Sequence, residues 1–223
     1  ITYTEIDSAN GKVGTKFTNP MSDTQKGTVN SVLSYAVTKQ KTLENADTTG
    51  VVDIDSSTGE ITALKSGVVE VTATLPGNSM YKETDCKYTI TVNRGTIETA
   101  TNGDSDATGF NFDLADSSIK YGFIGFSNKA FGGQSDSTLE IIYSENSDEL
   151  EVSQNGGIIT FNKTPAEAAT ETYTVTITAT KPQTDKYNEC TIEYQLTVTR
   201  DAVDSETEHL IQGAIERLIS GRT

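Results

Sequence analysis

Few side chains in this chain can do nucleophilic, acid–base or metal chemistry, and their spacing does not favour it. The chain has one histidine, His209, and two cysteines, Cys86 and Cys190. A Ser-His-Asp or Cys-His arrangement needs a base beside its nucleophile, yet neither cysteine is near His209 in sequence and no Gly-x-Ser-x-Gly segment occurs. The same scarcity excludes metal sites built from imidazole or thiolate ligands. We therefore expect a protein that is not an enzyme, with His209 on a helix surface.

Carboxylates supply the remaining candidate chemistry, because calcium prefers oxygen ligands. Neither acidic group has an Asp-x-Asp-x-Asp-Gly loop, and alternate residues of one strand simply share its solvent face. Sugar hydrolysis would also need aromatic platforms, and the chain has no tryptophan. We expect solvated carboxylates at turns and no cofactor, with a calcium site as the alternative. The two groups are Asp53, Asp55 and Glu60, and Asp104, Asp106, Asp113 and Asp116.

The two cysteines are predicted to be buried thiols that form no disulfide. Each alternates with apolar residues of a final strand, Cys86 with Tyr88 and Cys190 with Ile192. They occupy non-equivalent positions of the repeat described next, so the cores of separate modules would hold them too far apart to bridge. Both then act as small hydrophobic residues.

An internal repeat indicates how the chain is organised. Residues 71–94 return as 177–200, an offset of 106, with Thr-Ala-Thr before a proline, then Tyr-x-Glu, then Tyr-x-x-Thr-Val and a closing arginine. Upstream, 52–62 matches 150–160 at an offset of 98, so the second copy gains eight residues, which we place within 162–170. Modules of about 100 residues suit a seven-stranded sandwich.

The pattern predicts an all-β fold, with two immunoglobulin-like antiparallel β-sandwiches in tandem followed by a short C-terminal amphipathic α-helix. The domains are residues 1–95, a second and divergent sandwich over 96–200, and the helix over 201–223. Strands are expected where apolar residues alternate with threonine, and turns where glycine or asparagine allows a positive φ. The expected strands include 31–38, 68–74, 121–126, 139–143 and 173–180, the hairpin connections are 55–59 and 153–157, and 94–109 is either a linker or the first strand of the second module.

The helix is predicted from apolar residues at helical spacing, with a capping box of Ser205 and Glu208 and with Gly221 at its end. A single helix of about 15 residues is marginal in water, so its apolar stripe must pack on something. Its own module and another subunit are the two candidates, and we favour the other subunit. The stripe, a candidate interaction site, consists of Leu210, Ile211, Ala214, Ile215, Leu218 and Ile219.

Composition excludes several classes of partner. The formal net charge is −15 and the 17 basic residues are scattered, which argues against nucleic acid and against docking on anionic lipid. No stretch approaches the ~20 apolar residues of a membrane span, so no membrane insertion is expected. The chain begins at Ile1 without an initiator methionine or a leader, so we expect a processed protein or an excised fragment.

Residues 51–74 resemble the core of the bacterial immunoglobulin-like repeat family, group 2, in which a Val-x-x-Asp-x-x-x-Gly hairpin precedes a glycine and a threonine-rich strand. Residues 78–82 and 88–92 resemble the closing strands of such repeats in surface proteins of gut Bacteroidetes and in their phages. The first module matches over most of its length and the second only in its latter half. The resemblance implies an extracellular or virion-borne sandwich used for adhesion or as a spacer, and it carries over no catalytic residue.

We therefore expect a non-catalytic structural and adhesion protein whose tandem modules act as a cell-surface spacer or adhesin. Its partner would be a protein or glycan on another surface, contacted through loops such as 128–136 and 162–170. The alternative is a phage virion decoration or fibre protein, anchored in its own assembly by the C-terminal helix. A carbohydrate-binding module comes third, because Tyr121, Phe123 and Phe126 would suit a sugar platform, although packing as core strand residues explains them more simply.

Overall fold

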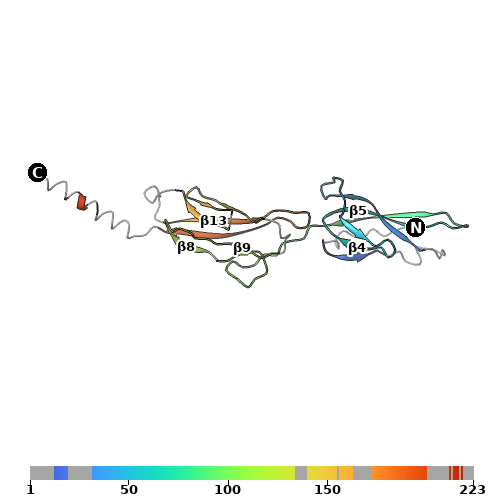
Figure 1. The fold of residues 1–223 in the computed structure, drawn as a ribbon, viewed down its shortest axis with the longest axis horizontal. Helices are drawn as coiled ribbons and strands as arrows, with labels where there is room; N and C mark the ends of the chain where they lie inside the picture. Colours follow the sequence, from blue (N-terminus) through green and yellow to red (C-terminus); the bar gives the residue numbers. More distant parts are fainter. Residues whose placement is uncertain are drawn as a thin grey trace. The chain divides into compact units, whose positions relative to one another are not determined.

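The computed structural model describes residues 13–19, 32–133, 140–154, 156–162 and 172–199, together with Ile211, 213–215 and Arg217. Its contacts divide the chain into two units, and strands dominate the described part of each (Figure 1). Unit 1 is Ile1–Thr96 with Gln183–Asn188, and unit 2 is Ile97–Pro182 with Glu189–Thr223.

In unit 1, the described strands form two antiparallel sheets of three strands each. The first has the order β1-β4-β3 and the second the order β2-β5-β6. Their bounds are β1 Lys16–Thr18, β2 Ser34–Lys41, β3 Val52–Ile54, β4 Glu60–Ala63, β5 Gly67–Leu75 and β6 Thr84–Val92.

The two sheets of unit 1 enclose an apolar core, so this unit is a β-sandwich. Alternation along β5 and β6 turns every second side chain inward, where it meets the inward side chains of β3 and β4. Fully burying one valine or isoleucine contributes about 1.5–3 kcal/mol, which makes this interleaving the main source of stability. The cluster comprises Val51, Val52, Ile61, Ala63, Val69, Val71, Tyr88, Ile90 and Val92, and a smaller one contains Leu33, Tyr35, Ala73 and Leu75.

The predicted hairpin connections are confirmed. Between β3 and β4, Gly59 has a φ of +72°, and a Cβ there would lie 3.0 Å from the Tyr35 ring. Between β11 and β12, Gly157 has a φ of +64° and donates its N–H to the Ser153 carbonyl at 3.1 Å. Glycine is required at both places because a reversal this tight needs the left-handed region.

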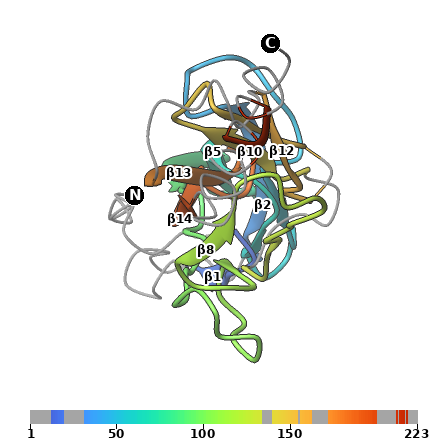
Figure 2. The same cartoon turned by 90° about the vertical axis from the view of Figure 1, so that its left-hand side faces the viewer.

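The described strands of unit 2 form one four-stranded sheet, in the order β10-β13-β14-β8, and two pairs, β11-β12 and β7-β9. β8 lies beside β14 (Figure 2) and pairs with it in parallel, so the expectation of purely antiparallel sheets was wrong at this edge. The other described pairings of the unit are antiparallel. The bounds are β7 Asn111–Phe112, β8 Ser117–Lys120, β9 Ala130–Phe131, β10 Ile142–Glu145, β11 Leu150–Val152, β12 Ile159–Phe161, β13 Thr172–Lys181 and β14 Cys190–Thr199.

Aromatic rings fill the centre of unit 2. Phe112 packs edge-on against Tyr194, with ring centroids 4.7 Å apart, and lies 6.5 Å from the Tyr143 ring. Such tilted pairs add about 0.5–1.5 kcal/mol beyond the area they bury. One basic residue is also buried here, because Lys181 is only 5% exposed.

The internal repeat is visible in strand register. Val71 lies opposite Tyr88 in the β5–β6 pair, and Ile177 lies opposite Tyr194 in the β13–β14 pair. Both partners of the second pair are 106 residues after those of the first. Each unit therefore contains the same hairpin, with the same residues facing inward.

Several predicted boundaries differ from the structure. Residues 121–126 were expected to be a strand, but they form turns in which Gly122 and Gly125 have φ of +80° and +84°. β2 and β10 begin three residues later than 31 and 139, and residues 31 and 139 themselves both lie outside the described part. The stretch 94–109 is not a ladder strand, because it makes only the isolated bridges Gly95↔Tyr187 and Thr99↔Phe110. The linker alternative agrees with the division of the chain, since unit 1 passes into unit 2 after Thr96.

Candidate functional site

Members of both acidic groups accept hydrogen bonds at turns and strand edges. Asp55 Oδ1 accepts from the backbone N–H groups of Ser57 at 2.9 Å and Thr58 at 2.8 Å, and from the Ser57 hydroxyl at 2.7 Å. These bonds, with the hydroxyl first, hold the pKa of Asp55 far below its usual range. Asp116 Oδ1 similarly accepts from Gln195 N at 2.9 Å. In the described residues, no three histidine, cysteine or acidic side chains are grouped to hold a metal.

The cysteines are not joined to each other, and both are only partly buried. The prediction that they face the apolar side of a strand is correct in register, but the prediction of full burial was wrong. Cys190 Sγ lies 3.8 Å from the Ile97 carbonyl, and desolvation raises the pKa of its thiol. A raised pKa keeps the thiol protonated, so it is a poor nucleophile near neutral pH.

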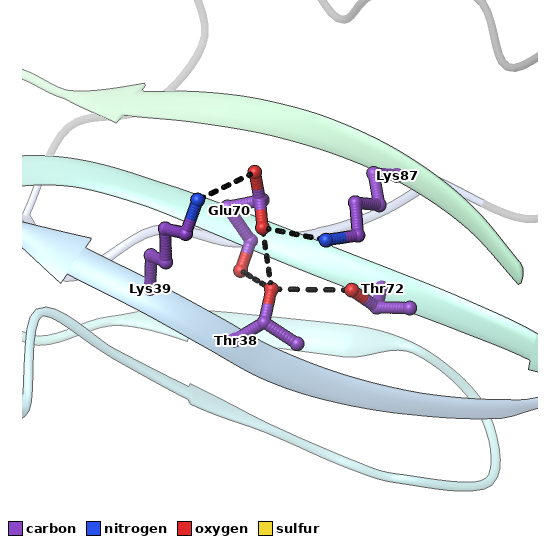
Figure 3. Close-up of polar contacts among 5 residues, drawn as sticks. All are labelled: Thr38, Lys39, Glu70, Thr72 and Lys87. Atoms are coloured by element: carbon purple, nitrogen blue, oxygen red, sulfur yellow. Dashed lines mark hydrogen bonds and ion pairs between the residues drawn. The ribbon is translucent and has the colours of Figure 1, made fainter.

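A polar network crosses the solvent face of the β2-β5-β6 sheet (Figure 3). Glu70 of β5 accepts from Thr38 Oγ1 at 2.9 Å and from Lys87 Nζ at 3.2 Å, and it lies 3.8 Å from Lys39 Nζ. The Thr38 hydroxyl, followed by Lys87, lowers the pKa of Glu70. A register shift between Val37 and Lys39 gives Thr38 this position. The network ties three strands together, and sequence reasoning missed it because a bulge leaves no clear local signal.

The segment 121–126 carries two exposed large apolar side chains in unit 2, Phe123 and Ile124. Tyr121 packs on Phe161 with ring centroids 4.6 Å apart, whereas Phe123 is 55% exposed and Ile124 is 94% exposed. The interpretation of these aromatic residues as core strand residues was therefore wrong for Phe123. The sugar-platform role of these three residues stays a prediction.

The loop 128–136 was a predicted ligand contact, but its first residue is structural. Asn128 is fully buried, and its side chain accepts from Leu114 N at 2.8 Å and donates to the Leu114 carbonyl at 3.1 Å. Residues 134–136 and 163–170 lie outside the described part of the chain. The ligand role of those residues stays a prediction.

Only part of the predicted C-terminal helix is described. Ile211, Ala214 and Ile215 have helical backbone, and all three are exposed, Ile211 by 56% and Ile215 by 50%. His209 lies outside the described part. So do the other stripe residues, Leu210, Leu218 and Ile219, and the predicted capping residues, Ser205, Glu208 and Gly221. Among the residues that the structure describes, no helix is long and apolar enough to cross a membrane.

One turn is bound closely within unit 1, and we call it the docked turn: Gln183–Asn188, between β13 and β14. Its own shape comes from Thr184, whose Oγ1 accepts from Lys186 N at 3.1 Å and Tyr187 N at 3.0 Å. Thr184 N also donates to the Tyr187 carbonyl at 2.9 Å. A side chain accepting from the backbone two and three residues on fixes such a turn without help from its surroundings.

Three residues of unit 1 hold the docked turn, and we call them the acceptor: Ser66, Arg94 and Gly95. All four hydrogen bonds go to the backbone of the turn. They are Ser66 N to Asp185 O (2.8 Å), Gly95 N to Lys186 O (2.7 Å), Asn188 N to Gly95 O (2.9 Å) and Arg94 Nε to Thr184 O (3.1 Å).

The acceptor residues suit this task. A Cβ on Gly95 would lie 3.1 Å from the Tyr187 ring, so glycine lets the ring lie directly over the backbone. Arg94, only 15% exposed, also pairs with Glu44 at 2.7 Å, and that contact is the main reason the pKa of Glu44 is lowered. Sequence reasoning found the repeated Tyr-x-Glu of both turns but not this role, because the binding uses backbone atoms.

Comparisons with known proteins give a likeness of fold only. No family model and no curated protein matches the chain. Extracellular repeats of cadherins are among the similar solved structures. Drosophila N-cadherin EC1-4 is 19% identical with a TM-score of 0.35, covering 77% of this chain and 42% of that one. Mouse cadherin-23 EC22-24 is 15% identical with a TM-score of 0.34, covering 76% and 54%.

Human protocadherin-24 EC1-2 is 14% identical with a TM-score of 0.36, covering 85% of this chain and 89% of that one. This chain spans about half the length of the N-cadherin and cadherin-23 structures. TM-scores below 0.5 carry no information on what this chain binds.

Proposed function

We propose that this chain is a non-catalytic structural and adhesion protein, in which tandem modules of the bacterial immunoglobulin-like type act as an extracellular spacer or adhesin. The modules are residues 1–95 and 96–200, followed by the helix 201–223. The observation that carries the proposal is the duplicated hairpin, with Val71 opposite Tyr88 and Ile177 opposite Tyr194. Repetition of one scaffold suits a protein that extends or presents a surface.

Contacts with a protein or glycan on another surface would be made by loops held on this scaffold. The loop 121–126 is the best described candidate, because Phe123 and Ile124 stand exposed between two glycines with positive φ. Neighbouring exposed apolar residues are a better candidate for a contact surface than apolar residues scattered singly. The charge of −15 favours neither nucleic acid nor anionic lipid as the partner.

A second candidate function is a phage virion decoration or fibre protein whose C-terminal helix attaches it to its own assembly. The exposure of Ile211 and Ile215 on one helix favours it. Apolar residues spaced four apart lie on the same side of a helix, where a second subunit would cover them.

Solution mass, measured by light scattering on a size-exclusion peak, distinguishes the two candidates. The samples are the full chain, a chain that ends at Arg200, and the full-length I211E/I215E variant. The proposed spacer or adhesin predicts a monomer for all three. If the full chain is a defined dimer or trimer, and if both the truncated chain and the I211E/I215E variant are monomers, the spacer or adhesin proposal is overturned in favour of the assembly role.

A further inference from the structure

Unit 1 contains a second turn with the same local structure as the docked turn. This open turn, residues 77–82, follows β5 (labelled in Figure 1) and corresponds to 183–188 at the repeat offset of 106. Asn78 takes the place of Thr184, and its Oδ1 accepts from Met80 N at 2.8 Å and Tyr81 N at 2.9 Å. Asn78 N donates to the Tyr81 carbonyl at 2.8 Å, as Thr184 N does to Tyr187 at 2.9 Å.

The backbone groups that bind in the docked turn are unoccupied in the open turn. Their counterparts are the carbonyls of 78–80 and the N–H of Lys82, and these have no hydrogen-bond partner within the described part of the chain. All residues of 77–82 are exposed, Met80 by 79% and Tyr81 by 50%, whereas Lys186 and Tyr187 are half-buried. The open turn therefore presents a preformed binding surface.

The shape of the open turn does not depend on a partner. Gly77 is needed inside it, since a Cβ there would lie 2.7 Å from Glu83 N. A turn already in its bound form loses little conformational entropy on binding, which favours association.

We propose that the open turn is a docking element for a separate β module that carries an acceptor like that of unit 1. Such a module offers a backbone N–H just before its fifth strand, as Ser66 does, and an arginine and a glycine just after its sixth, as Arg94 and Gly95 do. The acceptor of that module binds the backbone of the open turn, and the Tyr81 ring lies over the glycine of the acceptor. The inference depends on the two turns alone and holds for either function proposed above.

A transplant tests whether the acceptor of unit 1 accepts the open turn. In the full chain, residues 183–188 are replaced by Gly-Asn-Ser-Met-Tyr-Lys, the sequence of 77–82, and in a matched control by six alternating glycines and serines. In the transplant, we expect the exchange rates of the Ser66 and Gly95 amide protons to lie within about threefold of their rates in the natural chain. In the glycine–serine control, we expect both rates to be at least about tenfold higher than in the natural chain. A transplant that exchanges like the glycine–serine chain would overturn the proposal.

Binding in trans is tested with the glycine–serine chain as the probe, because its acceptor is vacant. We expect its addition to ¹⁵N-labelled natural chain to shift the amide resonances of 78–82. Asn78→Ala, which removes the cap of the turn, weakens this binding by about tenfold, which corresponds to one hydrogen-bonded cap. Ser79→Ala is the matched control with unchanged binding, since its counterpart Asp185 binds through its carbonyl.

A folded probe that leaves the resonances of 78–82 unmoved would contradict the proposal. If the probe does not fold, the transplant decides alone.

Discussion

The buried lysine of unit 2 allows the sharpest test of the energetics described above. Lys181 occupies the position that Leu75 holds in the first repeat, and its ammonium donates to the carbonyls of Gly132 and Gly133, the latter at 3.2 Å. It also lies 4.9 Å above the centre of the Phe110 ring. Lys181→Met keeps the aliphatic stem and removes only the charge and its donors.

The expected loss of stability follows from these contacts. Hydrogen bonds from a charged donor are worth about 1.5–3 kcal/mol each, and a cation–π contact adds about 0.5–2 kcal/mol. Releasing the ammonium from burial recovers several kcal/mol of desolvation. We therefore expect a net loss of about 2 kcal/mol, much less than the sum of the contacts.

Urea unfolding followed by tyrosine fluorescence measures this loss, since the chain has no tryptophan. Leu75→Met, at the matching position of unit 1, is the control, and it should cost less than about 1.5 kcal/mol. Burial lowers the pKa of Lys181 below 10.5, so the unfolded chain binds that proton more tightly. The natural chain should therefore gain stability over K181M as the pH rises towards 10.5. A K181M chain as stable as the natural one would refute this reasoning.

Three further predictions concern the turn, the polar face and the tyrosines. Asp55→Ala should lower the melting temperature of unit 1, because the N–H groups of Ser57 and Thr58 lose their acceptor, whereas Asp55→Asn should stay close to the natural value; equal melting of both variants would contradict the turn's role. The pKa of Glu70 is lowered on folding, so its contribution to stability is present above pH 4.5 and is lost as the pH falls. The urea midpoint should therefore depend less on pH between 6 and 3 in Glu70→Gln than in the natural chain. An equal pH dependence in the two chains would exclude the network. Desolvation raises the pKa of Tyr88 and Tyr173 to about 12, so the stability that these two residues contribute below pH 10 should decline between pH 10 and 12. Absorbance at 295 nm follows tyrosine ionisation. If it reaches its full value by pH 11 while the protein is still folded, the prediction is contradicted.

The strands that the sequence predicted best are those in which one face is apolar and the other is threonine. In β5 and β13 this alternation extends over nine and ten residues, so the inward face is unambiguous. The connections 55–59 and 153–157 were predictable because glycine with positive φ is the simplest way to reverse a strand.

Other features depend on contacts that no local pattern encodes. Residues 121–126 are as apolar as a strand, but Gly122 and Gly125 turn the chain, and Phe123 is exposed. The parallel pairing of β8 with β14 joins segments about 80 residues apart, and strand order of that kind is decided by tertiary packing. The docked turn was missed because three of its four hydrogen bonds join backbone groups, which every residue has.

Amide hydrogen exchange in the natural chain is the most direct test of the central claim, that two matching turns are a bound and an open copy of one docking element. The N–H groups of Ser66, Gly95 and Asn188 all donate within unit 1, whereas that of Lys82, the counterpart of Asn188, has no acceptor in the described part of the chain. We predict protection of the first three and exchange close to the unprotected rate at Lys82. Equal exchange at Asn188 and Lys82 would contradict the claim.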